Sequence, residues 1–179
     1  KLNLLKKDNK RLREILSLQE SSNNDKISAA VISRKTGSWW RQIILNKGSK
    51  DGVEIGSTVI GPGGLLGRVN STSLFTSSVT LLTSPESKVG VWVDRIQING
   101  LLIGAGDDHP NLILYSKGVD IKVGDFVSSS PASTLIPPNI PIGIVQSVDE
   151  SFKANKTAKI LLLAKPQVID WVKILKVKI

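Results

Sequence analysis

The stretch KGSKDGVEIGS, residues 47–57, places three glycines, a Lys-Gly-Ser and an Asp-Gly within eleven residues. Segments of this kind bind phosphate, bind calcium or turn the chain. A P-loop requires the order G-x-x-x-x-G-K-[ST], but Lys47 precedes Gly48 here and no glycine lies five residues earlier. A calcium loop requires several oxygen ligands at alternate positions, whereas Asp51 stands alone. The stretch is therefore predicted to be a turn that leads into a strand.

The same turn recurs about 65 residues later in the chain. Residues 52–59, GVEIGSTV, resemble residues 118–127, GVDIKVGDFV, apart from two residues inserted in the second copy. This spacing is longer than the period of most solenoid repeats. This repeated segment therefore predicts two related small barrels, each with this turn leading into a strand.

From residue 27 onward the chain consists of short β-like segments. Several alternate apolar and polar residues, and Gly, Pro, Asn or Asp separate them, as in all-β sandwiches and barrels. We therefore predict a mainly β fold with two small six-stranded barrels, at residues 25–84 and 85–179. Whether the C-terminal strands pack back onto the first barrel stays open. The predicted strands are 27–33, 40–46, 57–60, 65–70, 78–83, 88–93, 100–105, 111–116, 126–129, 142–148, 158–164 and 171–179.

The first segment, residues 1–24, is predicted to be a helix that forms a coiled coil. Residues 1–20 contain no Gly or Pro and are rich in helix formers. The heptad pattern lasts fewer than three heptads, so a single amphipathic helix packed on its own domain is the alternative. Asn at one core position is a device that fixes the register of parallel dimers. The residues of the predicted self-association seam are Leu2, Leu5, Asn9, Leu12 and Leu16.

The net charge of +9 reflects basic residues concentrated at both ends of the chain. A basic surface attracts nucleic acid, anionic lipid or an acidic partner. A basic nucleic-acid-binding β-domain is therefore one alternative function. However, the chain shows neither interleaved aromatic residues for base stacking nor a recognisable reading module. The prediction is that it binds no nucleic acid.

A trypsin-like hydrolase is the other alternative, because such enzymes also consist of two small β-barrels. A catalytic triad needs an aspartate that orients the histidine and a serine that the histidine activates. The single histidine, His109, lies in a turn-like segment, and Ser128–Ser130 lack the sequence context of a nucleophile. One histidine without any cysteine does not make an ordinary zinc site. We predict no enzyme activity and no catalytic, metal or cofactor site.

Trp39 and Trp40 form an adjacent pair in a chain with only 4% aromatic residues. One interpretation is a strand edge that buries one ring and leaves the other near the surface. The other is an aromatic anchor for a partner, because tryptophan is enriched at interface hot spots. Both residues are candidate partner-binding residues.

Five segments, in this order, resemble the periplasmic part of the rod-shape-determining protein MreC family. These are residues 27–60, GLLGRV (64–69), SVTLLTSPESKVGVWVDR (78–95), VGDFVSSS (123–130) and IPPNIPIGIVQSV (136–148). The chain departs from the usual pattern at Pro138-Asn139 and in the loop 128–134, which lacks its usual glycines. These departures affect only local partner contacts.

The resemblance implies a non-enzymatic scaffold of the bacterial cell-elongation machinery that maintains rod shape by organising or activating peptidoglycan synthases. It implies a position on the periplasmic side of the inner membrane, with a single-pass anchor ahead of Lys1. The implied partners are a class B penicillin-binding transpeptidase, MreD and the MreB-containing elongation complex, with self-association as a homodimer or higher assembly. The implied fold is a coiled coil followed by two barrels that resemble a trypsin-like fold without its catalytic residues, and we place the transpeptidase contact on the second barrel.

Overall fold

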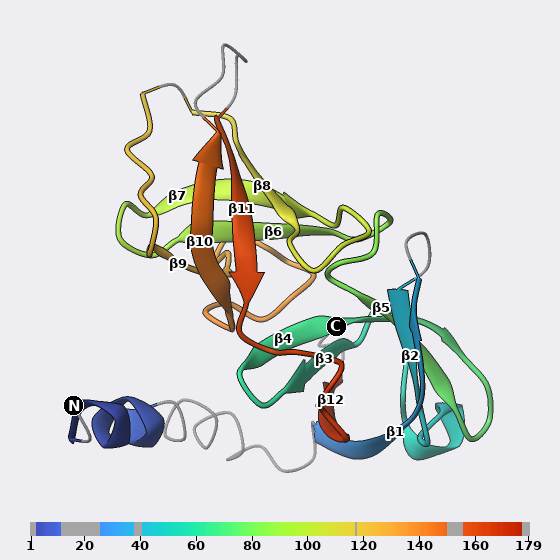
Figure 1. The fold of residues 1–179 in the computed structure, drawn as a ribbon. Helices are drawn as coiled ribbons and strands as arrows, with labels where there is room; N and C mark the ends of the chain where they lie inside the picture. Colours follow the sequence, from blue (N-terminus) through green and yellow to red (C-terminus); the bar gives the residue numbers. More distant parts are fainter. Residues whose placement is uncertain (1–2, 12–25, 38–40, 117, 150–155, 177–179) are drawn as a thin grey trace.

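The computed structural model describes residues 3–11, 26–37, 41–116, 118–149 and 156–176. Residues 3–11 are helical, and the rest forms two closed six-stranded barrels (Figure 1), which confirms the predicted mainly β fold. None of the helices in these ranges is both long and apolar enough to span a bilayer. The strands are β1 (Lys26–Thr36), β2 (Arg41–Leu45), β3 (Thr58–Gly61), β4 (Gly64–Thr72), β5 (Ser77–Leu81), β6 (Lys88–Val93), β7 (Ile98–Ile103), β8 (Asn111–Leu114), β9 (Phe126–Ser129), β10 (Pro141–Asp149), β11 (Lys156–Leu162) and β12 (Trp171–Leu175).

The two barrels have the same circular strand order. The first runs β1-β12-β3-β4-β5-β2 and the second runs β7-β6-β9-β10-β11-β8, with all neighbours antiparallel. When the two strand orders are aligned position by position, β12 of the first barrel corresponds to β6 of the second. β6 directly precedes its neighbour β7 in the chain, whereas β12 comes from the C-terminal end and inserts between β1 and β3. Of the C-terminal strands, whose placement the sequence left open, β12 completes the first barrel and β10 and β11 lie in the second.

The repeated turn has the same backbone geometry in both barrels. Gly56 and Gly124 have φ values of 91° and 95°, which side chains other than glycine rarely adopt. Gly56 donates its N–H to the carbonyl of Val69 at 2.8 Å, and Gly124 donates to that of Val145 at 2.9 Å. Each valine N–H returns a hydrogen bond to the residue after the glycine. The sequence echo thus marks one turn in equivalent places of two barrels.

The first half of the opening stretch forms the 3-10 helix η2 (Ser49–Asp51). The carboxylate of Asp51 accepts the N–H of Gly48 at 3.1 Å, and Gly52 ends the helix with φ 94°. Gly48 lies so close to the β4–β5 turn that a Cβ there would be 2.3 Å from the carbonyl oxygen of Ser73. The predicted turn is confirmed, and its acidic side chain is occupied in holding the turn.

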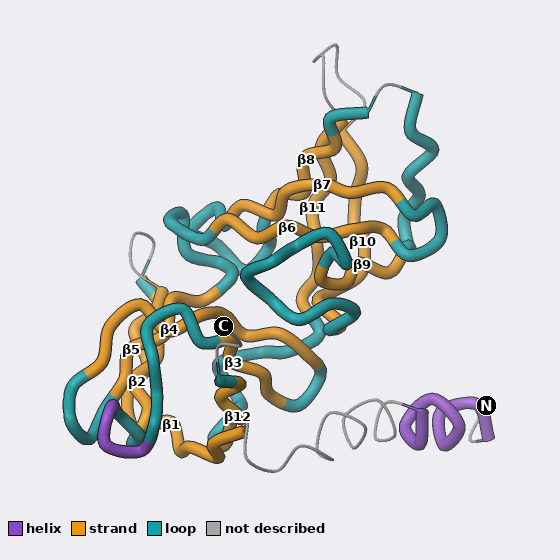
Figure 2. Tube along the Cα trace, turned by 180° about the vertical axis from the view of Figure 1, so that it is seen from behind, coloured by secondary structure: helices purple, strands orange, loops and turns teal. Residues whose placement is uncertain are grey.

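The barrels are packed against each other, and strands of both are visible from behind in Figure 2. Ile60, Leu65 and Leu82 of the first barrel belong to the same buried cluster as the core of the second. In the β3–β4 turn, a Cβ on Gly64 would lie 2.0 Å from the carbonyl oxygen of Pro141, at the start of β10. The contact between the barrels therefore includes a direct backbone approach that only glycine permits.

Candidate partner-binding surface

Three apolar side chains form a row across the outer face of the second barrel. Phe126 on β9 lies opposite Ile144 on β10, which in turn lies opposite Leu161 on β11. Phe126 is 55% exposed and Leu161 40% exposed, while Ile144 is half-buried. Their neighbours along the strands, including Val127 and Ile160, are buried in the barrel core, so the row faces outward. We call these three residues the apolar row.

The equivalent row in the first barrel is polar. The shared turn aligns Phe126 with Thr58, and the same register then aligns Ile144 with Arg68 and Leu161 with Thr80. The strand pairing supports this correspondence, because Arg68 lies opposite both Thr58 and Thr80. Scattered apolar residues on a surface are ordinary, but a contiguous patch marks an interaction site. The apolar row is thus a feature of the second barrel that the shared architecture does not require.

An ion pair fixes the loop that leads into Phe126. The Asp125 carboxylate is almost fully buried and accepts hydrogen bonds from Arg95 Nε at 2.7 Å and Arg95 Nη2 at 3.0 Å. The backbone N–H of Lys122 donates to the same carboxylate at 2.8 Å, and Arg95 also donates to the carbonyl of Asp120. The hydrogen bonds from Arg95 lower the pKa of Asp125, although burial opposes the shift. The ion pair between Arg95 and Asp125 therefore holds the loop before the apolar row in place.

Leu161 also lines a depression of about 400 Å³ that lies between the barrels. On its wall, Asp108 accepts hydrogen bonds from Arg41 of β2 at 2.8 Å and from Gln167 at 3.3 Å. The hydrogen bond from Arg41 lowers the pKa of Asp108. The buried hydroxyl of Thr83, which lines the depression, has no hydrogen-bond partner among the described residues. Leu161 thus belongs both to the apolar row and to the lining of this polar depression.

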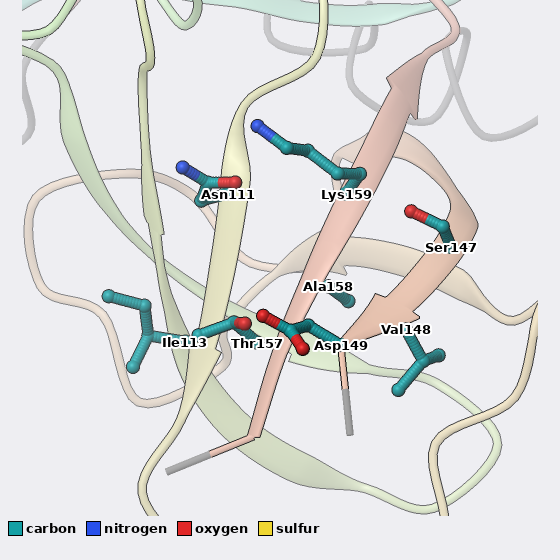
Figure 3. A pocket seen from close by; sticks show the side chains of 8 residues that line it. All are labelled: Asn111, Ile113, Ser147, Val148, Asp149, Thr157, Ala158 and Lys159. Carbon is teal, nitrogen blue, oxygen red and sulfur yellow. The ribbon is translucent and has the colours of Figure 1, made fainter. Parts of the chain in front are cut away.

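A second depression, of about 570 Å³, lies on the outer face of β8, β10 and β11 (Figure 3). Its two cross-strand rows follow the sheet register. The rows are Asn111, Lys159 and Ser147, and Ile113, Thr157 and Asp149. One carboxylate and one ammonium group among neutral side chains do not make a nucleophile–base arrangement.

The residues considered for a hydrolase do not come together. Ser128 shares a 2.5 Å hydrogen bond with Asp94, and Ser129 donates to the carbonyl of Pro137 at 2.6 Å. Ser130 similarly bonds the side chain of Asn99. The backbone N–H of His109 donates to the carboxylate of Asp107, and within the described ranges this histidine makes no hydrogen bond to a serine. The same ranges contain no group of three or more acidic, His or Cys side chains that could hold a metal ion.

Most residues of the predicted self-association and partner sites lie outside the described residues. These are Leu2, Leu12, Leu16, Trp39 and Trp40. Leu5 and Asn9 lie in the helical segment 3–11, and all nine of its residues are exposed.

Sequence reasoning did not identify the apolar row. A signal was present, because LGRVNS (66–71) in the first barrel matches IGIVQS (142–147) in the second. The two segments share Gly, Val and Ser positions, and both carry an irregularity in strand pairing just after the valine. Aligning them sets Arg68 against Ile144 at an outward-facing position.

Comparison with known proteins places this chain in one family. Residues 31–176 match the family described as the rod shape-determining protein MreC, barrel core. The cell shape-determining protein MreC of Caulobacter vibrioides is 32% identical over 97% of this chain and 49% of its own length. That of Listeria monocytogenes is 34% identical over 81% of this chain and 51% of its own length. The chain thus spans about half the length of these relatives.

Solved structures agree with these sequence matches. An MreC structure from Listeria monocytogenes has a TM-score of 0.79 at 27% identity, covering 99% of this chain and 91% of that one. MreC from Pseudomonas aeruginosa has a TM-score of 0.76 at 26% identity, covering 84% and 98%. MreC from Helicobacter pylori, solved in complex with the penicillin-binding protein PBP2, has a TM-score of 0.69 at 15% identity, covering 86% and 98%, and shows the same fold. The chain belongs to the MreC family of rod shape-determining proteins.

Proposed function

We propose that this chain is a non-enzymatic scaffold that binds a class B penicillin-binding transpeptidase through the apolar row of its second barrel. The observation that carries the proposal is the contrast between the two barrels, which differ in this row while they share strand order and turn geometry. The Helicobacter pylori relative was solved with PBP2, which supports a partner of this class. Binding would act by positioning the synthase or by shifting its conformational equilibrium.

The test is binding of the 179-residue chain to the extracytoplasmic part of the transpeptidase from the same organism, measured by surface plasmon resonance. Serine at both Phe126 and Leu161 removes two exposed apolar anchors, and we expect affinity to fall at least about tenfold. The matched control changes Ile55 and Val168, which are exposed apolar residues outside the row, to serine. Wild-type affinity in the folded row variant would show that the partner binds elsewhere.

Point substitutions are preferable to removal of residues 85–179. That deletion would take away β12 together with the second barrel, and β12 closes the first barrel between β1 and β3. A loss of binding after the deletion would therefore not identify which barrel carries the contact.

We propose that the coil of residues 1–24 makes the scaffold a homodimer or a higher assembly through Leu2, Leu5, Asn9, Leu12 and Leu16. The exposure of residues 3–11 supports this, because a helix packed on its own domain would bury one face. Analytical ultracentrifugation of the chain with and without residues 1–20 tests the seam. Monomers in both samples at high concentration would contradict it.

For the whole protein we propose a position on the periplasmic side of the inner membrane, with an anchor ahead of residue 1. MreD and the MreB-containing elongation complex are the further proposed partners. A C-terminal alkaline phosphatase fusion of the whole protein should be active, because that enzyme matures only outside the cytoplasm. An inactive but stable fusion would contradict the proposed location.

A further inference from the structure

The β4–β5 turn presents two large apolar side chains at its apex. Leu74 is 63% exposed and Phe75 59% exposed. Ser73 caps the turn, because its hydroxyl accepts the backbone N–H of Thr76 at 3.2 Å. This turn chemistry does not require large apolar residues at the tip. Two adjacent exposed apolar side chains form a small patch of the kind that marks an interaction site.

The apex is a rigid structure. Ser73 and Thr76 are joined by a backbone hydrogen bond of 2.9 Å and a bond of 2.5 Å between their hydroxyls. From η2, the N–H of Ser49 donates to the carbonyl of Ser73 at 2.8 Å, and that of Lys50 donates to Leu74 at 3.1 Å. Two separate parts of the chain thus hold Leu74 and Phe75 in water, at the cost of exposing apolar surface.

Two exposed lysines lie beside η2, and one of them contacts the apex. The ammonium of Lys50 lies 5.3 Å from the centre of the Phe75 ring, and Lys50 is exposed. On the other side of η2, exposed Lys176 lies within 3.6 Å of the Cβ position of Gly52. The nearby acidic groups are Asp51, which is bonded to the N–H of Gly48, and Glu54.

The apex also lies where it could meet a flat surface. Figure 2 shows η2 at the end of the first barrel that points away from the second barrel. The chain enters the first barrel at this end, because the side chain of Ile27 in β1 lies 3.8 Å from the Cβ position of Gly52.

We propose that Leu74 and Phe75 insert into an anionic lipid surface, with Lys50 and Lys176 paired to the headgroup phosphates. Apolar side chains with lysines beside them are typical of interfacial membrane anchors, whose long basic side chains reach back to the headgroups. A convex apex has no groove for a peptide, whereas a bilayer accepts a projection of this shape. The site is separate from the apolar row, which lies on the other barrel.

Co-sedimentation of the 179-residue chain with vesicles tests the proposal. Vesicles of phosphatidylglycerol and phosphatidylethanolamine should bind the chain, and phosphatidylcholine vesicles should not. Serine at both Leu74 and Phe75 should lower the partition coefficient at least tenfold, and Lys50→Gln should lower it about fivefold, as for one charge near the surface. Serine at Ile55 and Val168, with the same loss of exposed apolar surface, should leave binding unchanged.

A second readout does not depend on comparing affinities. The chain has no cysteine, so Leu74→Cys accepts a single environment-sensitive dye, and Val168→Cys provides the control position. The dye at residue 74 should shift to shorter wavelength with anionic vesicles, and the dye at residue 168 should not.

Three results would overturn the proposal. They are equal vesicle binding by the wild type and the Leu74/Phe75 variant, equal binding to neutral vesicles, and a dye at residue 74 that stays in water. If substitution at the apex weakened transpeptidase binding and left vesicle binding intact, the apex would be a protein contact instead.

Discussion

Replacing Gly64 by alanine should be among the most damaging single-methyl changes in this protein. The new Cβ would lie 2.0 Å from the carbonyl oxygen of Pro141, and ordinary contacts begin near 3.4 Å. The β3–β4 turn and β10 would have to separate by about 1.4 Å, the difference between these two distances. Both groups are backbone, so no side chain can turn away to relieve the contact.

The cost has two parts. The φ of Gly64 is 145°, and a side chain in such a region costs about 1–3 kcal/mol. Forcing an extra carbon into a filled contact costs a further ~1–3 kcal/mol. We therefore expect the free energy of unfolding to fall by about 4 kcal/mol, which is a large part of the stability of a domain of this size.

Alanine substitutions at three other glycines measure the backbone strain and the steric overlap separately. Gly124 has φ 95° and open space around its Cβ position, so alanine there should cost only the backbone strain of about 1–2 kcal/mol. Gly67 has no such φ, but its Cβ would lie 2.0 Å from the carbonyl oxygen of Thr80, so alanine should cost only the overlap of ~1–3 kcal/mol. At Gly90 the nearest atom of the described residues, apart from the chain neighbours, is the Cβ of Ser133 at 3.9 Å, and alanine should stabilise by about 0.4–1 kcal/mol.

Urea denaturation of the four variants, followed by far-ultraviolet circular dichroism and by tryptophan fluorescence, measures the series. Because Ile60, Leu65 and Leu82 share a buried cluster with the second barrel, both signals should report one transition. If Gly64→Ala unfolded within about 0.5 kcal/mol of Gly90→Ala, the range of ordinary surface substitutions, the close approach of the barrels would be refuted.

Two further predictions concern charged groups. Asp125→Asn should lower the free energy of unfolding more at neutral pH than in acid, because the pKa of Asp125 is lowered in the folded state. The ionised carboxylate therefore stabilises the fold above the ordinary aspartate pKa of about 4, and this stabilisation is lost as pH falls through the folded-state pKa. Urea midpoints at pH 7 and pH 3 measure this, and an equal loss at both would contradict it. Arg34→Met removes hydrogen bonds to Pro166, Ile169 and Asp170, which precede β12, and should speed hydrogen exchange in β12 more than in β10. Unchanged exchange in β12 would show that Arg34 does not hold this strand.

Local chemistry made the barrels predictable from the sequence. Alternating strands and the Gly56 and Gly124 turns depend on residues close together in the chain, and both turns require the backbone freedom of glycine. The absence of nucleophile context at Ser128 was likewise readable from its neighbours, and the structure gives that hydroxyl a hydrogen bond with Asp94. Short-range patterns therefore gave both the fold class and the lack of a hydrolase sequence context.

The apolar row was not predictable in the same way, because its members come from three different strands. Phe126, Ile144 and Leu161 each occur singly among alternating residues, and single exposed apolar residues are ordinary. Only the strand register brings them together. Trp39 and Trp40 lie outside the described residues, so their role in partner binding stays a prediction.

The placement of β12 leads to a last prediction about the connection of the chain. Leu175 at the end of β12 lies opposite Lys26 at the start of β1, as Val93 lies opposite Ile98 in the second barrel. Residues 94–97 join that second pair. The same four-residue turn should therefore be able to join β12 to β1.

We expect a permuted chain, with residues 165–176, this turn and then residues 26–164, to fold like residues 26–176 in their natural order. All strand pairs of both barrels survive the permutation, because a closed circle of strands does not depend on where the chain enters it. Urea midpoints and two-dimensional NMR spectra compare the two proteins. If the permuted chain failed to fold while the natural order folded, β12 would need its tether to β11 in order to close the first barrel. If it folds, the C-terminal crossover is not needed to close the barrel, and its remaining effect is to tie the two barrels together at a second point besides residues 82–87. Two connections instead of one restrict the rotation of one barrel relative to the other.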